Sequence, residues 1–200
     1  MAEVKGKQIS KKTLILETAK DIFSQKGYDD SSMDEIALKA GVPKSLIYYH
    51  FKSKDELLQE VISNFFKEYE NLLSTENTLN DCKYLQFLDQ NSDFLRVIVI
   101  ESIKKNDSSS YVFKVVELLM EYESKITGNE NLAEYKKSHE RWVVEFFTSI
   151  VPGVLFACYK EKWCNHFNTD KTALEQDFLS AYNQTHGAYH RSILERKSEK

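Results

Sequence analysis

Apolar residues recur every three or four positions along most of this chain, which is the period of an α-helix with one buried face. A first stripe ends at Gly27, a residue type that commonly terminates helices. It consists of Leu14, Ile15, Ala19, Ile22 and Phe23. A second stripe runs for about five turns from Leu57 to Leu73 without glycine or proline. We therefore predict a first helix over residues 10–26 and one long, continuous helix over residues 54–74.

Between these two stripes, residues 31–54 read SSMDEIALKAGVPKSLIYYHFKSK. Ser32 is a good N-cap, and Glu35 three residues later can return a hydrogen bond to it, so a short helix is expected to begin at Met33. Gly41 ends this helix because glycine enters the left-handed conformation without a steric penalty. Pro43 then restarts the chain at a helix N-terminus, where its missing N–H has no intrahelical partner.

The second short helix is predicted from about Lys44 to His50. Ile47, with Val42 and Phe51, supplies apolar anchors for packing on the preceding helix. The remaining polar side chains then face outward, and they are Lys44, Ser45, Tyr48, Tyr49 and His50. Basic groups and aromatic hydroxyls suit phosphates and base edges. The stretch therefore indicates a helix-turn-helix that enters a DNA groove.

A second helical domain is expected after residue 74. The polar segments TENTLND, DQNSD, KKNDSSS and TGNEN separate predicted helices over 79–89, 92–104, 109–127 and 131–163. Pro152 and Gly153 are expected to interrupt and kink the last of these helices. A loop with the sequence NHFNTD precedes a terminal helix over 172–196. The predicted fold class is therefore all-α.

Composition and charge are consistent with this organisation. Two prolines and six glycines in 200 residues, with 29% charged residues, favour helices throughout. No apolar run approaches the ~20 residues of a membrane helix, and the N-terminus has no apolar signal segment, so we expect a cytoplasmic protein without a membrane partner. The net charge is −4, but residues 1–56 carry 10 basic against 9 acidic side chains. The acidic excess therefore lies away from the helix-turn-helix.

The segment AGVPKSLIYYHFKSKDELL resembles the signature of the tetracycline-repressor (TetR) family of bacterial transcription regulators, and the resemblance covers about residues 10–60. It implies a DNA-binding domain over 1–53, in which three helices form a head, and a helical effector-binding and dimerisation domain over 54–200. By resemblance, base edges or nearby phosphates are contacted by Lys44, Ser45 and Tyr48, and phosphates by Ser32, Tyr49, His50 and Lys54. Two residues depart from the family pattern. Pro43 stands where many members have serine or threonine, and Leu46 stands where threonine is frequent. Leu46 either contacts a thymine methyl or packs inward.

The resemblance also implies a homodimer that binds a palindromic operator in double-stranded DNA and responds to a small-molecule effector. In the family, the last two long helices pair with those of a second copy; interface candidates here are Phe156, Tyr159, Phe178, Tyr182 and Tyr189. A small apolar or aromatic effector would occupy a cavity lined by Phe94, Ile98, Tyr111, Phe113, Met120, Trp142, Phe146, Phe147 and Cys158. The same side chains at helical spacing also suit a plain core. The family default is repression, relieved by the effector.

Other functions leave weaker signs. Cys158, Cys164 and His166 lie close in sequence, and His186 and His190 share a helical face, but neither set supplies a full ligand group, so we predict no metal and no cofactor. No nucleophile elbow, glycine-rich phosphate loop or HExxH motif is found, and we predict that the protein is not an enzyme. A helical adaptor that binds protein rather than DNA remains the alternative function.

Overall fold

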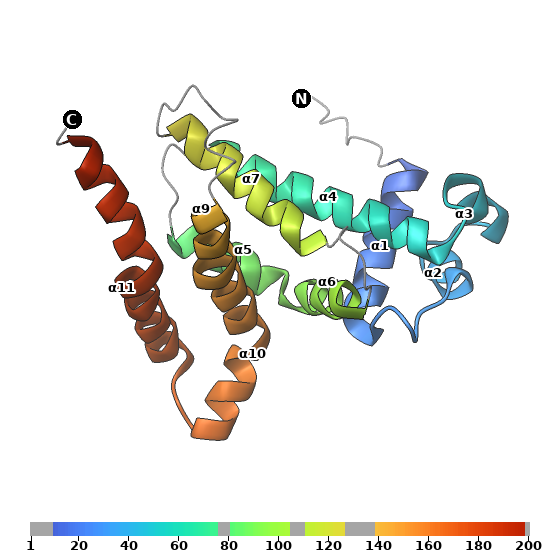
Figure 1. Ribbon diagram of the computed structural model, residues 1–200. Helices are drawn as coiled ribbons and strands as arrows, with labels where there is room; N and C mark the ends of the chain where they lie inside the picture. The colour runs from blue at the N-terminus through green and yellow to red at the C-terminus, as the bar shows by residue number, and fades with distance from the viewer. Residues whose placement is uncertain (1–9, 76–80, 105–110, 127–138, 199–200) are drawn as a thin grey trace, which may run out of the picture. The chain divides into compact units, whose positions relative to one another are not determined.

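The computed structural model describes residues 10–75, 81–104, 111–126 and 139–198. Every regular element in these ranges is a helix (Figure 1), which agrees with the predicted all-α class. The contacts divide the chain into two compact units, Met1–Glu68 and Tyr69–Lys200. Each unit is described by itself below.

The first unit contains α1 (Lys11–Lys26), α2 (Met33–Lys39), α3 (Lys44–His50) and the first part of α4 (Lys54–Thr75). These bounds follow the predicted helices to within a residue or so. The caps explain the starts of α1 and α2, because the hydroxyl of Ser10 accepts from the N–H of Thr13 and that of Ser32 accepts from the N–H of Glu35. The carboxylate of Glu35 pairs with Lys26 at 2.6 Å, whereas a capping box had been expected.

Apolar side chains from all four helices of the first unit form one core. The fully buried members are Ile15, Ile22, Phe23, Ile36, Ile47, Phe51, Leu57, Leu58 and Ile62. Two exposed ion pairs join α1 to α4 beside this core, from Lys12 to Glu60 at 3.1 Å and from Lys20 to Glu68 at 3.2 Å. The first part of α4 therefore packs as the fourth helix of the first unit.

The division between the units lies inside α4, after Glu68, whereas the sequence had suggested a boundary at residue 53. The reason is the periodicity of α4, since Leu57, Leu58, Val61 and Phe65 are all buried. The same helix continues without a break to Thr75. One continuous helix therefore contributes residues to both units, and its length agrees with the long apolar stripe.

The second unit contains α5 (Asp81–Gln90), α6 (Ser92–Lys104), α7 (Tyr111–Ile126), α9 (His139–Val144), the π-helix η1 (Glu145–Ile150), α10 (Val151–Phe167) and α11 (Lys171–Ser198). The predictions for α5, α6, α7 and α11 agree within about two residues. The predicted helix over 131–163 begins outside the described residues and extends further than expected, to Phe167. The NHFNTD loop is shorter than expected and begins at Asn168, which has a left-handed φ of 51°.

Pro152 does not interrupt its helix. The helical path is continuous from His139 to Phe167, and six residues before the proline form a π-helix. The N–H of Val151 donates to the carbonyl of Phe146, five residues earlier, and Pro152 then lies in the first turn of α10, where no N–H is required. The wider π turn thus accommodates the proline without ending the helix.

Buried apolar side chains from α5, α6, α7, η1 and α10 form the core of the second unit, and they include Tyr84, Leu88, Phe94, Ile98, Val116, Met120, Ile150 and Val154. Gly153 permits a close approach between α10 and α5. A Cβ atom at this position would lie 2.9 Å from the hydroxyl of Tyr84 and 3.1 Å from Cδ1 of Leu88. Glycine is therefore required here by packing rather than by backbone conformation.

The continuous helix His139–Phe167 is long and apolar enough to span a membrane by length and composition, contrary to the sequence-based expectation that no such run exists. The core helices of soluble proteins can be equally long and apolar. Two charged side chains inside this helix are buried and have partners on other helices, Glu145 beside His186 of α11 and Lys160 beside Asp89 of α5. Such pairing is typical of a helix packed within a folded domain.

Candidate nucleic-acid interface

The turn between α2 and α3 is fixed by local backbone chemistry. Gly41 has a φ of +61°, the left-handed value that was expected to end α2. The N–H of Val42 donates to the carbonyl of Ala37 at 3.1 Å, which draws the chain back across the end of α2. Pro43 precedes α3 and offers no side-chain cap, so α3 begins through backbone geometry alone. Together these features produce a helix-turn-helix.

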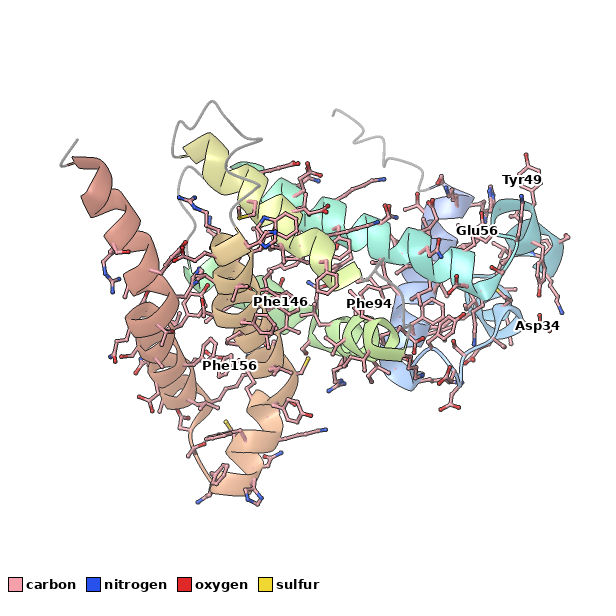
Figure 2. The ribbon with its side chains drawn as sticks, viewed as in Figure 1. Asp34, Tyr49, Glu56, Phe94, Phe146 and Phe156 are labelled. Carbon is pink, nitrogen blue, oxygen red and sulfur yellow. The ribbon has the colours of Figure 1, made fainter. Side chains whose placement is uncertain are left out.

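One side of α3 is buried and the other is exposed. Ile47 is fully buried, and Val42 and Phe51 flank it in the core, as predicted. Tyr48 is 46% exposed and Tyr49 is 81% exposed, and Figure 2 shows Tyr49 pointing away from the helix. Lys44 and Ser45 are also exposed. A short helix thus presents hydroxyl and ammonium donors to solvent, where a DNA groove could receive them.

Lys44 is held by a carboxylate of the preceding helix. Its ammonium lies 2.6 Å and 2.7 Å from the two carboxylate oxygens of Asp34, and the Tyr48 ring lies 6.0 Å away. The hydrogen bond that Lys44 donates to Asp34 raises the pKa of Lys44 above its ordinary value. Both side chains are more than half exposed. Lys44 therefore carries its charge at the surface, where it is paired with Asp34. The sequence analysis did not predict this ion pair.

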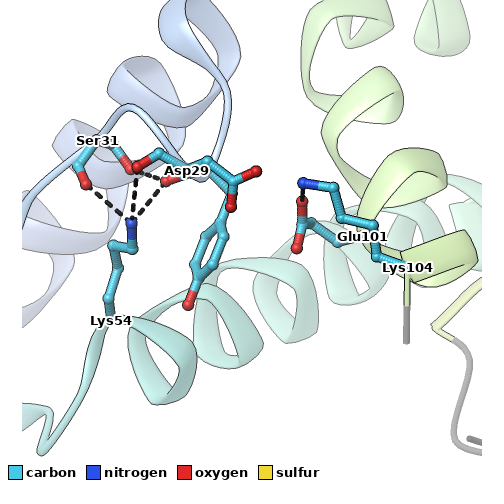
Figure 3. Close-up of polar contacts among 6 residues, drawn as sticks. Asp29, Ser31, Lys54, Glu101 and Lys104 are labelled. Carbon is cyan, nitrogen blue, oxygen red and sulfur yellow. Dashed lines mark hydrogen bonds and ion pairs between the residues drawn. The ribbon is translucent and has the colours of Figure 1, made fainter. Parts of the chain in front are cut away.

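Lys54, which was expected to contact a phosphate, forms its hydrogen bonds within the head. Its ammonium donates to the carbonyls of Tyr28 at 2.7 Å, Ser31 at 2.9 Å and Asp29 at 3.3 Å (Figure 3). It also lies 4.3 Å from the centre of the Tyr28 ring. An ammonium has three protons, and three acceptors receive them here. Lys54 consequently fastens the loop between α1 and α2 to the first turn of α4.

The other predicted contact residues lie around the turn. Ser32 is exposed, although its hydroxyl already accepts from the N–H of Glu35 at 3.2 Å. His50 is half-buried, with its ring 5.1 Å from that of Tyr49 and 6.1 Å from that of Phe51. Leu46 is also half-buried, so it neither lies in the core nor stands free in solvent. The structure thus brings Ser32 and the residues of α3 into one head and leaves their contacts with DNA as a prediction.

The residues predicted to line an effector pocket do not share one environment. Phe94, Ile98 and Met120 are buried in the core, whereas Phe113, Trp142 and Phe147 are 41–62% exposed. Phe146 and Cys158 are half-buried, and burial raises the pKa of the Cys158 thiol. The side chain of Tyr111 lies outside the described residues. Aromatic contacts link Phe146 to Phe113 at 5.4 Å and to Phe147 at 4.8 Å between ring centres.

A cavity of about 210 Å³ lies elsewhere, among α5, α10 and α11. Its lining consists of Leu85, Gln86, Asp89, Phe156, Ala157, Lys160, Glu175 and Leu179, and none of these had been assigned to a pocket. The side chain of Lys160 is 3% exposed, and its ammonium lies 2.5 Å from Asp89 and 3.0 Å from Glu175. Burial lowers the pKa of Lys160, but the hydrogen bonds that its ammonium donates to the two carboxylates outweigh this effect and hold the pKa above its ordinary value. The charge is thus retained at the wall of the cavity.

Several residues predicted for a dimer interface also pack within the chain. The rings of Phe156 and Phe178 are stacked at 3.9 Å, which joins α10 to α11. The hydroxyl of Tyr182 lies 2.7 Å from that of Ser149 on η1. Tyr189 is half-buried, whereas Tyr159 is 57% exposed and remains available to a partner. Phe156, Phe178 and Tyr182 therefore already contribute to the packing of α11 on α10 and η1.

An exposed apolar stripe follows α10, and its member Tyr159 was among the interface residues predicted from the sequence. Leu155, Tyr159, Trp163 and Phe167 recur at intervals of four residues along α10 and are 44–57% exposed. The helical period alone was a sufficient signal, because residues four apart share one face. Among the described side chains of α11, only His186 is fully buried. Extensive surface on both terminal helices is therefore left uncovered by the residues that the structure describes.

The cysteine and histidine sets considered for metal binding have other neighbours. Cys158 and Cys164 are free thiols. Nδ1 of His186 lies 3.0 Å from the hydroxyl of Thr148, and its Nε2 lies 3.7 Å from the Glu145 carboxylate. Within the part of the chain that the structure describes, no three His, Cys, Asp or Glu side chains are grouped as metal ligands would be.

The N-terminal part of the chain is similar in sequence to known transcriptional regulators. Residues 15–61 match the model of the family described as bacterial regulatory proteins, tetR family. Curated relatives include the uncharacterized HTH-type transcriptional regulator YhgD of Bacillus subtilis strain 168, 45% identical over 60 residues, which are 30% of this chain and 31% of the relative. IcaR of Staphylococcus epidermidis, a negative transcriptional regulator of the biofilm operon icaADBC, is 33% identical over 58 residues, or 29% of this chain and 31% of the relative. The match thus spans about a third of each relative's length.

Two solved structures resemble the fold over most of the chain. The transcriptional regulator FadR from Bacillus subtilis, solved in complex with stearoyl-CoA, is 15% identical and covers 84% of this chain and 96% of its own, with a TM-score of 0.53. A TetR family regulator from Vibrio parahaemolyticus is 19% identical and covers 87% of this chain and 97% of its own, with a TM-score of 0.52. Because the sequence identities are this low, these two structures show a similarity of fold alone.

The geometry of α2, the Gly41 turn and α3 is that of a helix-turn-helix, a motif that places its second helix in a DNA groove. The family match covers α2, α3 and most of the core that supports them. Through residues 15–61, the chain is similar to the tetR family of bacterial regulatory proteins.

Proposed function

We propose that this protein is a homodimeric transcriptional regulator, most simply a repressor, that binds a palindromic operator and is released by a small apolar or aromatic effector. The observation that carries the proposal is the exposed side of α3, which presents Lys44, Ser45, Tyr48 and Tyr49 while Ile47 is buried on the opposite side. These donors are poorly suited to a protein core and well suited to a major groove. A regulator of this kind acts on chromosomal DNA, so we place it in the cytoplasm.

The DNA contacts follow from exposure and chemistry. Lys44, Ser45 and Tyr48 would meet base edges or the nearest phosphates, and Tyr49 and Ser32 would meet the phosphate backbone. Half-buried Leu46 and His50 lie beside them and complete the contact surface. Lys54 would act indirectly, by fixing the loop Tyr28–Ser31 that precedes α2.

A second copy is required because one helix of seven residues reads only half of a palindrome. The exposed stripe Leu155, Tyr159, Trp163 and Phe167 supports pairing through α10, and the exposed length of α11 supports a contribution from that helix. An isologous interface of this kind would be built from the same face of each copy. Its centre is expected at Tyr159 and Trp163, the aromatic members in the middle of the stripe.

An effector site is supported by the cavity among α5, α10 and α11. Its walls are partly apolar, through Leu85, Phe156 and Leu179, and a volume of about 210 Å³ suits a small ligand. The B. subtilis FadR structure, which contains stearoyl-CoA, shows that a protein of this fold can hold an acyl ligand. The effector would favour one arrangement of the terminal helices and shift the population of DNA-competent dimers.

The coupling between sites would be reciprocal. If the effector lowers operator affinity roughly 5- to 150-fold, a coupling of ~1 to 3 kcal/mol, then the operator lowers effector affinity by the same factor. The continuous α4 is the element through which such a change would reach the head. Equal affinity of an effector for the free and operator-bound dimer would exclude this mechanism.

The test of the whole proposal is capture of fragments of the host genome by the purified protein across a salt series. A sequence-specific regulator should recover a few palindromic sites, with log affinity falling by about 0.9 per phosphate neutralised for each unit of log salt. A helical adaptor should recover fragments indifferently and weakly. Genes beside the recovered sites would then supply effectors to test for release.

A further inference from the structure

Asp34 stands beside the proposed DNA contacts although its charge opposes them. It lies on α2, is 62% exposed, and both of its carboxylate oxygens are within 2.7 Å of the Lys44 ammonium. Figure 2 shows it on the same head as Tyr49. A carboxylate on a surface that meets phosphates weakens DNA binding unless it has a further task.

We propose that Asp34 is a specificity-determining residue, which restrains the Lys44 ammonium and thereby weakens binding to arbitrary DNA more than binding to the operator. This inference rests on the proposed function of α3. To contact a phosphate of arbitrary DNA, Lys44 must give up one exposed ion partner for another. The gain in binding is then small, and the carboxylate left behind repels the backbone.

At an operator, Lys44 need not give up its ion pair with Asp34 to bind, because the base edges are presented at a fixed position. An ammonium has three protons, so Lys44 can keep one bond to Asp34 while it donates to O6 and N7 of a guanine. The carboxylate then orients the donor instead of competing with the target. It would also accept from the N4 amino group of a cytosine placed next to it.

The same helix supplies a matched control. Glu35 follows Asp34 in sequence and pairs with Lys26 at 2.6 Å, at the end of α1. Glu35→Gln removes one negative charge from α2 and frees one lysine, as Asp34→Asn does. The two variants differ in which lysine is freed, and only Asp34→Asn frees a lysine of α3.

The experiment first selects duplexes with a randomised central region on the wild-type protein, and then takes the most enriched duplex and a scrambled duplex of equal composition. Affinities for both are measured across a salt series with wild type, Asp34→Asn, Glu35→Gln, Lys44→Ala and the double variant Asp34→Asn/Lys44→Ala. Asp34→Asn should raise affinity for the scrambled duplex roughly two- to fivefold. It should also steepen the salt slope by about 0.9 per protomer that gains a phosphate contact.

The enriched duplex should gain less, so the ratio of the two affinities should fall. Glu35→Gln should leave the ratio near the wild-type value, and Asp34→Asn should change nothing further in the Lys44→Ala background. Equal gains on both duplexes, an equal effect of Glu35→Gln, or persistence of the effect without Lys44 would each overturn the inference. If wild type enriches no duplex, the proposed sequence-specific function fails, while the slope on scrambled DNA still decides whether Asp34 restrains Lys44.

Discussion

The ammonium of Lys54 donates to the carbonyl of Tyr28 at 2.7 Å and lies 4.3 Å above the ring of the same tyrosine. Two further carbonyls in the same loop, those of Asp29 and Ser31, also accept from it. A charged donor from the first turn of α4 therefore closes the loop that leads into α2. Lys54 thus has a structural role in the head, and its contact with a phosphate stays a prediction.

We expect Lys54→Ala to lower the free energy of unfolding of the protein by about 1–3 kcal/mol, since charge-assisted hydrogen bonds are lost and carbonyls lose their donor. The salt slope of DNA binding should remain unchanged. Urea denaturation and duplex binding measure the two quantities. Lys52→Ala is the control, because Lys52 is exposed beside the same turn. If Lys54→Ala flattened the salt slope of DNA binding by about one unit and left the free energy of unfolding unchanged, Lys54 would be a phosphate contact instead.

Tyr48 and Tyr49 are neighbours on α3 and provide a matched pair of substitutions. Tyr48→Phe should weaken binding to the operator roughly five- to tenfold, because the lost hydroxyl would contact a base edge. The affinity for scrambled DNA should change little. Tyr49→Phe should weaken both duplexes similarly, as loss of a phosphate contact does. Competition binding at a fixed salt concentration distinguishes these outcomes. The assignment of Tyr48 fails if its substitution leaves the preference for the operator intact.

Gly153 should not tolerate a methyl group. A Cβ atom there would meet the Tyr84 hydroxyl at 2.9 Å inside the core, so Gly153→Ala should destabilise the protein by about 1–3 kcal/mol. Gly187→Ala is the contrasting control, since the nearest atoms there belong to the polar side chains of Asn183 and Arg191. That change should be neutral or stabilising by up to about 1 kcal/mol, because alanine favours helix. Equal effects at the two glycines would contradict the packing argument.

Alkaline pH should destabilise the protein partly through Tyr84. Burial raises the pKa of this phenol well above its usual value, so the folded state retains a proton that the unfolded state releases above about pH 10. The stability contributed by Tyr84 is therefore complete below that pH and falls as pH rises. Tyr84→Phe should flatten the loss of stability between about pH 9 and pH 11, relative to wild type, in urea denaturation. An unchanged pH profile would show that other groups control it.

Trp163 should be a principal residue of the proposed dimer. It is 49% exposed in the middle of the aromatic stripe, and its ring lies 4.5 Å from that of Phe167. Trp163→Ser should raise the dimer dissociation constant at least about tenfold, since aromatic anchors dominate such interfaces. Sedimentation equilibrium across a concentration series measures this constant, and exposed Glu161→Ser is the control. A monomeric wild type, or an unchanged dimer in Trp163→Ser, would contradict the assignment.

The sequence by itself determined the helical elements and the helix-turn-helix. Ser32, Gly41 and Pro43 act through caps and backbone angles, which depend on neighbours a few residues away. The apolar periods likewise located Ile47 in the core and α4 as one long helix, because a buried stripe is a property of a single helix. Local chemistry was therefore sufficient to predict the similarity of this head to the tetR family.

Tertiary structure alone decided which distant side chains meet. The pairing of Lys44 with Asp34, the capture of Lys54 by the Tyr28–Ser31 loop, and the enclosure of Lys160 by Asp89 and Glu175 join residues of different elements. No period or motif encodes such contacts. Tertiary packing also decided which aromatic residues lie in the core, in the cavity wall or on the exposed stripe. Their burial depends on how neighbouring helices pack and not on the spacing along one helix.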